Sequence, residues 1–262
     1  MKIRVYGQSR KKLKKYIEKN FKDLELISKE DGGSKPEVII CYGGDGTLLL
    51  AEREEPGIPK VAIRDSQICN KCREESKDTV LKLLSQKKYH ITEHHKIEAL
   101  CNGNKIIALN DIIIGHYYIN TALRFRVLID NVPYGGEFLG DGLVAATTIW
   151  STAYYQSITR SNFQEGIGLA FNNTVNSIGH VVVNEKTKIK IIITRGPGRV
   201  RFDNDRCYIN LKDNDEILIQ SSKEKSKLVN FSDGHKKLNI DISQNRLPLG
   251  YCQICRRYYR DY

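Results

Sequence analysis

The sequence predicts two domains, an α/β domain built on a parallel sheet followed by a domain rich in β-strands. In residues 1–88, short apolar runs alternate with segments whose apolar residues recur at helical spacing, the pattern of a parallel α/β sheet. From about residue 89 onward, strand candidates follow one another with a single helix candidate among them. We therefore expect a first domain over 1–88, a second over 89–240, and a tail over 241–262 that packs on the first domain.

The elements of the first domain are predicted from apolar runs that are bounded by polar and turn-forming residues. The first helix is indicated by Leu13, Tyr16 and Ile17, which fall on one helical face. Loops are expected over 31–36 and 55–59, where glycine and proline are concentrated. Strands are expected over 3–6, 24–27, 37–42 and 60–63, and helices over 9–21, from a glycine turn to about 54, and over 76–86.

The second domain is predicted from shorter apolar runs separated by turns. The Asn102-Gly103-Asn104 turn is a strong hairpin signal between two of these runs. Only residues 151–159 favour a helix. Strands are expected over 90–100, 105–116, 123–129, 167–171, 180–183, 188–194, 200–202, 207–209, 216–220 and 227–231.

The composition is that of a basic globular protein. The 262 residues are 40% hydrophobic and carry a formal net charge of +11, which predicts attraction to nucleotides, nucleic acid or an anionic surface. No apolar run approaches the roughly 20 residues that cross a bilayer. The first residues resemble a strand and lack the apolar region of a signal peptide. We expect a cytoplasmic protein without a membrane partner.

Two segments concentrate the positive charge. Residues 10–15 hold Arg10 and four lysines, and Lys19 follows; we interpret these as the solvent-exposed face of the first helix. Residues 256–262 interleave arginine with tyrosine. Such side chains can stack on bases while their charges meet phosphates, and they are equally ordinary in a C-terminus packed on the protein.

The segment Gly43-Gly44-Asp45-Gly46-Thr47 directly follows a buried strand and opens a helix. Glycines remove the Cβ atoms that would keep a phosphate away from backbone N–H groups, and a helix N-terminus attracts negative charge. A carboxylate in such a turn is costly beside phosphates unless it holds a metal or accepts a proton. Asp45 is therefore predicted to do chemistry; the alternative is an ordinary strand-to-helix turn with a surface aspartate.

Four of the seven cysteines form two Cys-x-x-Cys pairs, Cys69 with Cys72 and Cys252 with Cys255. Two such pairs can supply the four thiolates of a closed tetrahedral site, so we expect a structural Zn²⁺ that clips the C-terminus to the first domain. A redox disulfide in either pair, a cubic iron–sulfur cluster held by all four thiolates, and four unrelated cysteines are the alternatives. The other cysteines are expected to be small core residues in apolar strands: Cys41, Cys101 and Cys207.

Three motifs, taken in order, resemble the NAD kinase family. The first is the glycine turn at 43–47, and the second is Ala108-Leu109-Asn110-Asp111-Ile112. The third is Asp141-Gly142-Leu143-Val144 followed by Ser151-Thr152-Ala153-Tyr154, with a late echo of an Asp-Gly turn at 201–205. Diacylglycerol and sphingosine kinases share the first motif alone, whereas all three in this order are much more specific. The resemblance extends over about residues 35–232 and implies an NAD kinase-like fold.

The resemblance also implies a kinase that transfers the γ-phosphoryl group of ATP, bound with Mg²⁺, to a ribose 2′-hydroxyl, most simply that of NAD. Asp45 would accept the proton of that hydroxyl or help to hold Mg²⁺. The implied phosphate-binding residues are Gly43, Gly44, Gly46 and Thr47. The implied substrate-binding residues are Asn110 and Asp111 at base or ribose hydroxyls, Asp141 at ribose, and Thr152, Ala153, Tyr154 and Ser157 at adenine.

Structural roles account for some of these residues as well. A turn between short strands explains Asn110-Asp111, and capping of a helix N-terminus explains Ser151-Thr152. The sequence also departs from the family: Trp150 replaces a glycine of the third motif, and the Cys69/Cys72 pair replaces a nucleotide-approaching loop after Arg64. Residues 172–176 stand where the family carries a Pro-His…Arg-Pro segment. These departures bear on the substrate more than on the fold.

Two further functions are therefore considered. The first is a 2′-hydroxyl kinase that acts on RNA or another nucleotide, favoured by the basic charge and by Trp150. The second is a non-catalytic relative that binds nucleotides or nucleic acid. The complete set of Asp45, Asn110, Asp111 and Asp141 favours catalysis over this relative. The family resemblance also implies a homo-oligomer.

Overall fold

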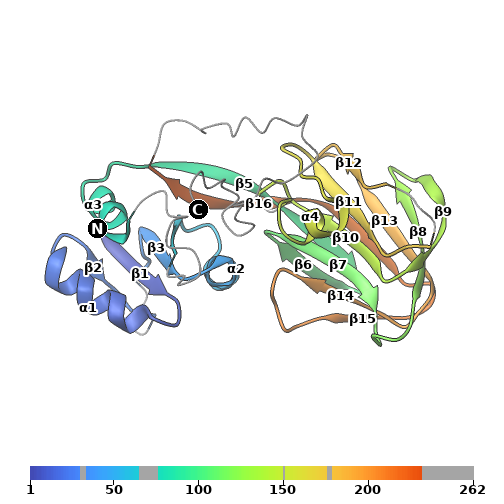
Figure 1. Ribbon diagram of the computed structural model, residues 1–262, viewed down its shortest axis with the longest axis horizontal. Coiled ribbons are helices and arrows are strands. Elements are labelled where there is room, and N and C mark those ends of the chain that lie inside the picture. The colour runs from blue at the N-terminus through green and yellow to red at the C-terminus, as the bar shows by residue number, and fades with distance from the viewer. Residues whose placement is uncertain (30–33, 65–75, 150, 176–178, 232–262) are drawn as a thin grey trace, which may run out of the picture. The chain divides into compact units, whose positions relative to one another are not determined.

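The computed structural model describes residues 1–29, 34–64, 76–149, 151–175 and 179–231 of the chain (Figure 1). These residues form two compact units that interleave along the sequence. Unit 1 contains residues 1–51, 58–92 and the described chain from 227 onward, and unit 2 contains residues 52–57 and 93–226. The sequence-based boundaries at 88 and 240 remain predictions.

Unit 1 is built on a parallel sheet with the strand order β2-β1-β3-β4. The strands are β1 (Lys2–Tyr6), β2 (Glu25–Leu26), β3 (Val38–Tyr42) and β4 (Lys60–Ile63). Val5 pairs with Ile40, and Tyr42 pairs with Ile63, in parallel register. Every residue of β3 is buried, as expected of a central parallel strand that is covered on both faces.

Among the described residues of unit 1, three helices begin: α1 (Arg10–Asn20), α2 (Asp45–Glu54) and α3 (Lys77–Ser85). Leu13 and Ile17 of α1 pack into the core of unit 1, four residues apart on one helical face. Leu81 and Leu84 of α3 pack into the same core. The Ser76 hydroxyl caps α3 by accepting a hydrogen bond from the Thr79 N–H at 3.1 Å.

The described residues of unit 2 are rich in β-structure and form one short helix, α4 (Tyr154–Thr159). One sheet of this unit has the order β12-β11-β10-β7-β14-β15. In the other, β16, β13, β8 and β9 pair in that order, and β5 pairs with β16 and with β6. The first sheet is formed by β7 (Asp111–His116), β10 (Gly142–Ala146), β11 (Ile167–Asn172), β12 (Val181–Val183), β14 (Gly198–Phe202) and β15 (Ile209–Leu211). The other strands are β5 (His90–Cys101), β6 (Asn104–Ala108), β8 (Leu123–Ile129), β9 (Val132–Gly140), β13 (Ile189–Arg195) and β16 (Glu216–Asn230).

Apolar side chains from both sheets fill the core of unit 2. Phe138 lies 4.5 Å from Phe171 and 5.4 Å from Phe125 between ring centroids, and all three rings are buried. The neighbouring strands supply mostly isoleucine, leucine and valine. The parallel sheet of unit 1 and the β-rich unit 2 confirm the predicted fold class.

Several predicted elements need correction. The single strand expected over 105–116 is two strands, because Leu109 and Asn110 leave the strand conformation and separate β6 from β7. The two strands expected over 216–231 form the single strand β16, which pairs with β13 through Ile219 and with β4 through Leu228. Strands β9 and β10 were not predicted, since glycine, proline and alanine give them low strand propensity.

None of the helices formed by the described residues is both long enough and apolar enough to cross a membrane.

Candidate functional site

The glycine turn of unit 1 lies between β3 and α2, at the carboxyl edge of the parallel sheet. The N–H of Gly43 donates to the Ile63 carbonyl at 2.9 Å, and the N–H of Thr47 donates to the Gly44 carbonyl at 3.0 Å. A Cβ on Gly43 would lie 2.5 Å from the Thr47 hydroxyl oxygen, whereas a Cβ on Gly44 would meet nothing within 4 Å. The turn is therefore tight on its inner side and open on its outer side. Ligands of open α/β sheets bind at this edge.

Asp45 is the first residue of α2 and is solvent-exposed. Its carboxylate lies 3.7 Å from the guanidinium of Arg64, which directly follows β4, with 60% of the Asp45 side chain exposed. The parallel register of β3 and β4 brings these residues together, because both strands end at the same edge. The turn thus combines an open backbone, a carboxylate and a nearby cation. Sequence reasoning noted Arg64 and gave it no role.

In unit 2, the short segment that connects β6 to β7 is fixed by Asp203, which follows β14. The Asp203 carboxylate accepts hydrogen bonds from the backbone N–H groups of Leu109 at 3.1 Å, Asn110 at 2.7 Å and Asp111 at 3.3 Å. The Thr147 hydroxyl donates to the Leu109 carbonyl at 2.6 Å, and its N–H donates to the Asn110 carbonyl at 2.9 Å. The backbone of 109–111 is fixed from both sides.

The side chains of this fixed segment have unused acceptor atoms. The Oδ1 atoms of Asn110 and Asp111 are buried and have no hydrogen-bond partner among the described residues. Burial, together with the nearby Asp203 carboxylate, raises the pKa of Asp111 to about 7. Burial also raises the pKa of Asp203, against the lowering effect of its backbone N–H donors. Buried acceptors without partners are unfavourable in the protein alone and favourable where a ligand donates to them.

The third motif continues into α4, and the structure corrects the interpretation of Ser151-Thr152 as the N-terminal cap of this helix. The Ser151 hydroxyl donates to the Phe163 carbonyl at 3.1 Å, and α4 begins only at Tyr154, without a side-chain cap. The Tyr154 ring is 37% exposed, and its hydroxyl accepts a hydrogen bond from the Asn172 side chain at 3.0 Å. Ser157 is exposed, and its hydroxyl donates to the Tyr154 carbonyl. Of the residues assigned to adenine, Tyr154 and Ser157 thus lie on the surface, whereas Thr152 and Ala153 are half-buried.

Asp141 is not brought together with Asn110 and Asp111. It immediately precedes β10, whose far end, Ala146, pairs with Asp111, so about 15 Å of strand separates the two aspartates. Its carboxylate instead accepts a hydrogen bond from Asn173 at 3.2 Å. Within the motif, Gly142 has a structural reason, because a Cβ there would lie 1.9 Å from the Ile114 carbonyl oxygen. The assignment of Asp141 to ribose stays a prediction, for a position at the opposite end of β10 from Asp111.

The last residues of α2 belong to unit 2 and carry buried charge. The Lys96 ammonium lies 2.5 Å from one carboxylate oxygen of Glu52, and the Ser226 hydroxyl donates to the other at 2.8 Å. Both charged side chains are only 4% exposed. The next residue, Arg53, pairs with Asp205 at 3.1 Å. Two ion pairs thus hold Glu52 and Arg53 within unit 2.

Comparison with known proteins places the chain in a family. No protein-family model matches the sequence. The NAD kinase of Sulfurisphaera tokodaii is 30% identical over 213 residues, which cover 75% of this chain and 82% of the relative. The NAD kinase of Clostridium tetani is 28% identical over 267 aligned positions, covering 94% of this chain and 95% of the relative. The chain belongs to the NAD kinase family. It is accordingly a phosphotransferase with an alcohol group as acceptor.

Solved structures of NAD kinases have the same fold. An NAD kinase from Archaeoglobus fulgidus in complex with ATP superposes with a TM-score of 0.69 at 18% identity and covers 87% of this chain and 93% of its own. Yeast NADH kinase complexed with NADH superposes with a TM-score of 0.73 at 13% identity and covers 89% of this chain and 84% of its own. At these identities, the likeness shows the fold alone.

Sequence reasoning did not assign a role to Asp203 in this NAD kinase family member, although residues 201–205 carried a signal. The similarity to the family's Asp-Gly turn identified the segment. The three backbone N–H groups that donate hydrogen bonds to Asp203 lie more than 90 residues earlier in the sequence. The backbone of Asp203 has a φ of 47°, a conformation that aspartate tolerates in turns. The sequence offered no way to pair this turn with Asn110.

The cysteine predictions have mixed outcomes. Cys41 and Cys101 are buried, as predicted, whereas Cys207 is exposed and lies outside any strand, between β14 and β15. The interpretation of Cys207 as a core residue is therefore wrong. Residues 65–75, Trp150 and residues 232–262 lie outside the described part of the chain, so the Zn²⁺ site at Cys69, Cys72, Cys252 and Cys255 stays a prediction.

The raised pKa of Asp111 predicts a pH-dependent stability. An unfolded Asp ionises near pH 4, whereas Asp111 in the folded protein holds its proton to about pH 7. The folded state therefore binds more protons between these values, and the free energy of unfolding should fall as the pH rises from about 4 to about 7. Asp111→Asn should remove most of this fall. Urea unfolding at a series of pH values measures it, and parallel curves for the two proteins would contradict the prediction.

The buried pair of Lys96 and Glu52 predicts a large effect of removing one charge. Lys96→Met leaves the Glu52 carboxylate buried without its cation and should cost about 3–5 kcal/mol of unfolding free energy. The double variant Lys96→Met/Glu52→Leu should recover much of the loss, because it leaves no uncompensated charge. Denaturant unfolding of all three proteins checks the cycle. Equal losses in the single and the double variant would contradict it.

Proposed function

We propose that this chain transfers the γ-phosphoryl group of ATP to the ribose 2′-hydroxyl of NAD and so makes NADP. The observation that carries the proposal is the exposed Asp45 carboxylate at the first residue of α2, in an open glycine turn of an NAD kinase family member. Relatives named NAD kinase align with most of the chain. Structures of the same fold hold ATP in one case and NADH in another, which supports the same pair of substrate classes here.

The glycine turn is proposed to hold the phosphates of ATP. Gly44 and Gly46 are exposed, so their backbone N–H groups can approach phosphate oxygens without interference from side chains. The start of α2 adds the favourable field of a helix N-terminus, and the Thr47 hydroxyl is a further donor. Arg64, 3.7 Å from Asp45, is placed to offset negative charge near the turn.

The Asp45 carboxylate is proposed to act as the proton acceptor. The 2′-oxygen of the ribose attacks the γ-phosphorus, the bond from that phosphorus to the bridging oxygen breaks, and ADP leaves. Asp45 takes the proton of the hydroxyl in the same step. In reactions of this class, orientation of the nucleophile and neutralisation of charge supply most of the rate enhancement.

The residues of the turn also fit a magnesium ion. Mg²⁺ prefers carboxylate oxygens together with phosphate oxygens and water, and Asp45 presents an exposed carboxylate beside the proposed phosphate site. When bound, the ion neutralises phosphate charge. Asp45 is the residue that would hold it, an alternative to its role as a base. The two roles are separable by the pH dependence and the metal dependence of the rate.

The segment at the start of β7 is proposed to bind the dinucleotide. Asn110 and Asp111 carry buried oxygen atoms with no partner in the described chain, and ribose hydroxyls are donors of the kind that would satisfy them. With a pKa of about 7, Asp111 can accept such a bond when ionised or donate one when protonated. Thr152, Ala153, Tyr154 and Ser157 are proposed to line the adenine. Asp141, at the other end of β10 from Asp111, is proposed to contact a ribose, as the family resemblance implies.

The direct test is an assay of NADP formation from ATP, Mg²⁺ and NAD. We expect NADP from the natural protein, and Asp45→Asn should reduce turnover by about 10²-fold or more, the usual contribution of a general base. Asp23→Asn is the matched control, since Asp23 is an exposed aspartate of the same unit outside the turn. No NADP from correctly folded protein would remove the NAD assignment. Label transfer from ATP into RNA would then favour the RNA 2′-hydroxyl kinase.

The position of Asp203 predicts a loss of dinucleotide binding when its acceptor atoms are removed. Asp203→Ala frees the N–H groups of 109–111 and should weaken NAD binding about tenfold, in line with the loss of one hydrogen bond to a charged group. Asp213→Ala is the control, because Asp213 also accepts a backbone N–H, that of Gly196 at 2.6 Å, in a different turn. Calorimetric titration with NAD measures both. Equal affinity in the two variants would show that Asp203 does not position the site.

A further inference from the structure

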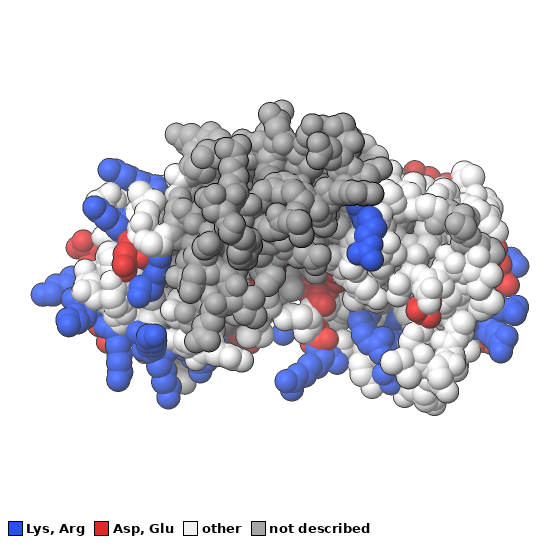
Figure 2. Space-filling model, viewed as in Figure 1, with Lys and Arg blue, Asp and Glu red and all other residues white. Residues whose placement is uncertain are grey.

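Helix α1 has a strongly basic outer face that the proposed reaction does not use. Its apolar residues Leu13 and Ile17 are buried in unit 1, which directs its lysines to the surface. Figure 2 shows Lys and Arg side chains gathered over this end of unit 1. Among the described residues, no carboxylate forms an ion pair with a lysine of α1. This charge is therefore available to an external anion. The lysines concerned are Lys11, Lys12, Lys14, Lys15 and Lys19.

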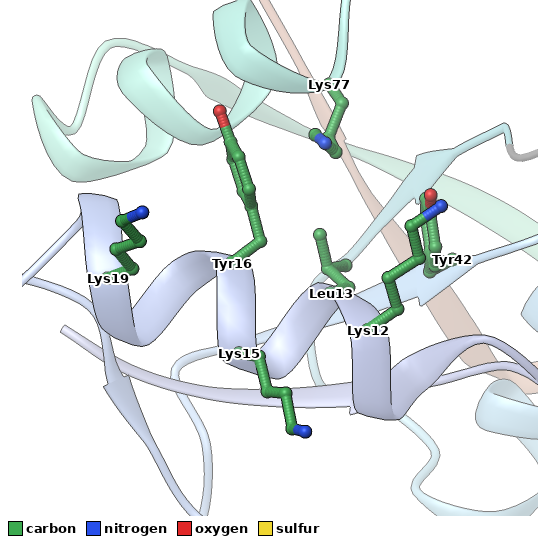
Figure 3. A pocket seen from close by; sticks show the side chains of 7 residues that line it. All are labelled: Lys12, Leu13, Lys15, Tyr16, Lys19, Tyr42 and Lys77. Carbon is green, nitrogen blue, oxygen red and sulfur yellow. The ribbon is translucent and has the colours of Figure 1, made fainter.

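A groove of about 270 Å³ runs between α1 and the start of α3 (Figure 3). Four lysines line it, together with the rings of Tyr16 and Tyr42, and none of the acidic side chains in the described part of the chain does. We call it the lysine groove, and its cations are Lys12, Lys15, Lys19 and Lys77.

One wall of the lysine groove is fixed in place. The Lys77 ammonium lies 3.7 Å from the centroid of the Tyr16 ring, a cation–π contact between α3 and α1. The Tyr16 hydroxyl donates to the Asp78 carboxylate at 2.6 Å, which fixes the ring. Figure 3 shows the Lys77 side chain reaching from α3 toward α1, and Lys12 reaching toward Tyr42. The Lys77 charge is thus held on one side of the groove by its contact with Tyr16.

The spacing of the lysines on α1 favours an extended anion. Lys12, Lys15 and Lys19 occupy positions i, i+3 and i+7 and span about 10 Å along the helix. A line of cations of this length matches successive phosphates of a polymer better than one compact anion. Insertion into a lipid surface is disfavoured, because the apolar side of α1 lies in the protein core.

We infer that the lysine groove binds the phosphate backbone of a nucleic acid without sequence preference. Lysines meet phosphates as point charges and carry no information about bases. Stacking of a base on the face of Tyr16 that Lys77 covers is blocked, which leaves the phosphates as the recognised groups. The inference is independent of the proposed kinase reaction, since none of the residues of the groove has a role in that reaction.

The test is binding of a labelled RNA of about 20 nucleotides and mixed sequence, longer than typical single-strand sites. Fluorescence anisotropy is measured between about 50 and 200 mM salt, where contacts to phosphates weaken steeply. The variant is Lys12→Gln/Lys15→Gln/Lys19→Gln, which keeps good helix propensity. The matched control is Lys186→Gln/Lys212→Gln/Lys223→Gln, which removes the same charge from exposed positions of unit 2.

We expect the α1 variant to bind RNA about tenfold or more weakly at low salt. The slope of log K against log salt should fall by about 2, since each lost phosphate contact contributes about 0.7 for a single strand. The control should keep both values close to those of the natural protein. Thermal stability and NADP formation should be unchanged in both variants, so failure of the kinase proposal is distinguished from failure of this one.

Three outcomes would overturn the inference. Equal weakening in the two variants would assign the binding to overall charge. Tight binding of inorganic polyphosphate through the lysines of α1, with no measurable binding of RNA, would assign the groove to a different anion. Binding to phosphatidylserine vesicles that is lost in the α1 variant, again without RNA binding, would assign it to a membrane surface.

Discussion

The site in unit 2 depends on one carboxylate, that of Asp203. By accepting the N–H groups of Leu109, Asn110 and Asp111, it ends β6 and sets the position from which β7 starts. The N–H of Asp203 returns a hydrogen bond to the Asp111 carbonyl at 2.9 Å, so the two segments fix each other. Burying this acceptor beside Asp111 has a cost, which is expressed in the raised pKa of both aspartates. Buried carboxylates that lower stability at a connection between two strands are typical of a binding site and not of a turn that stabilises the fold.

The glycine turn of unit 1 and the Asn110 segment of unit 2 differ in how far the sequence could predict them. The glycine turn is local: a buried strand, three glycines and a helix start follow one another within a dozen residues, and the structure has each where expected. The partner of Asn110 is not local, because Asp203 belongs to a turn more than 90 residues later. Hydrophobic periodicity over 105–116 predicted one strand, although Asn110-Asp111 was also explained by a turn between short strands. In the structure, hydrogen bonds to Asp203 fix the segment that separates β6 from β7.

Adjacency in a motif is likewise not adjacency in the fold. Asp141 and Thr147 flank one short strand, and an extended strand separates its ends by the full length of its residues. β10 therefore carries Asp141 away from Asp111, although the family resemblance assigns both residues to the substrate. A helix of the same number of residues would have kept them less than half as far apart. The glycines at 135, 136, 140 and 142 hid β9 and β10 from prediction, and Gly142 is required there by the closeness of the Ile114 carbonyl.

In the segment 109–111, the backbone groups have hydrogen-bond partners within the protein, whereas two side-chain oxygen atoms have none in the described part of the chain. We interpret the first as support of the site and the second as groups that recognise a ligand. The backbone of 109–111 is bonded to Asp203 and to Thr147, so its position is settled before any ligand arrives. The Oδ1 atoms of Asn110 and Asp111 have no such partners among the described residues. Each unpaired buried acceptor costs about 1–3 kcal/mol, and a hydroxyl donor from a ligand would recover that cost. Rigid backbone with unsatisfied side chains is the arrangement that rejects an analogue lacking the hydroxyl, because such an analogue leaves the cost in place.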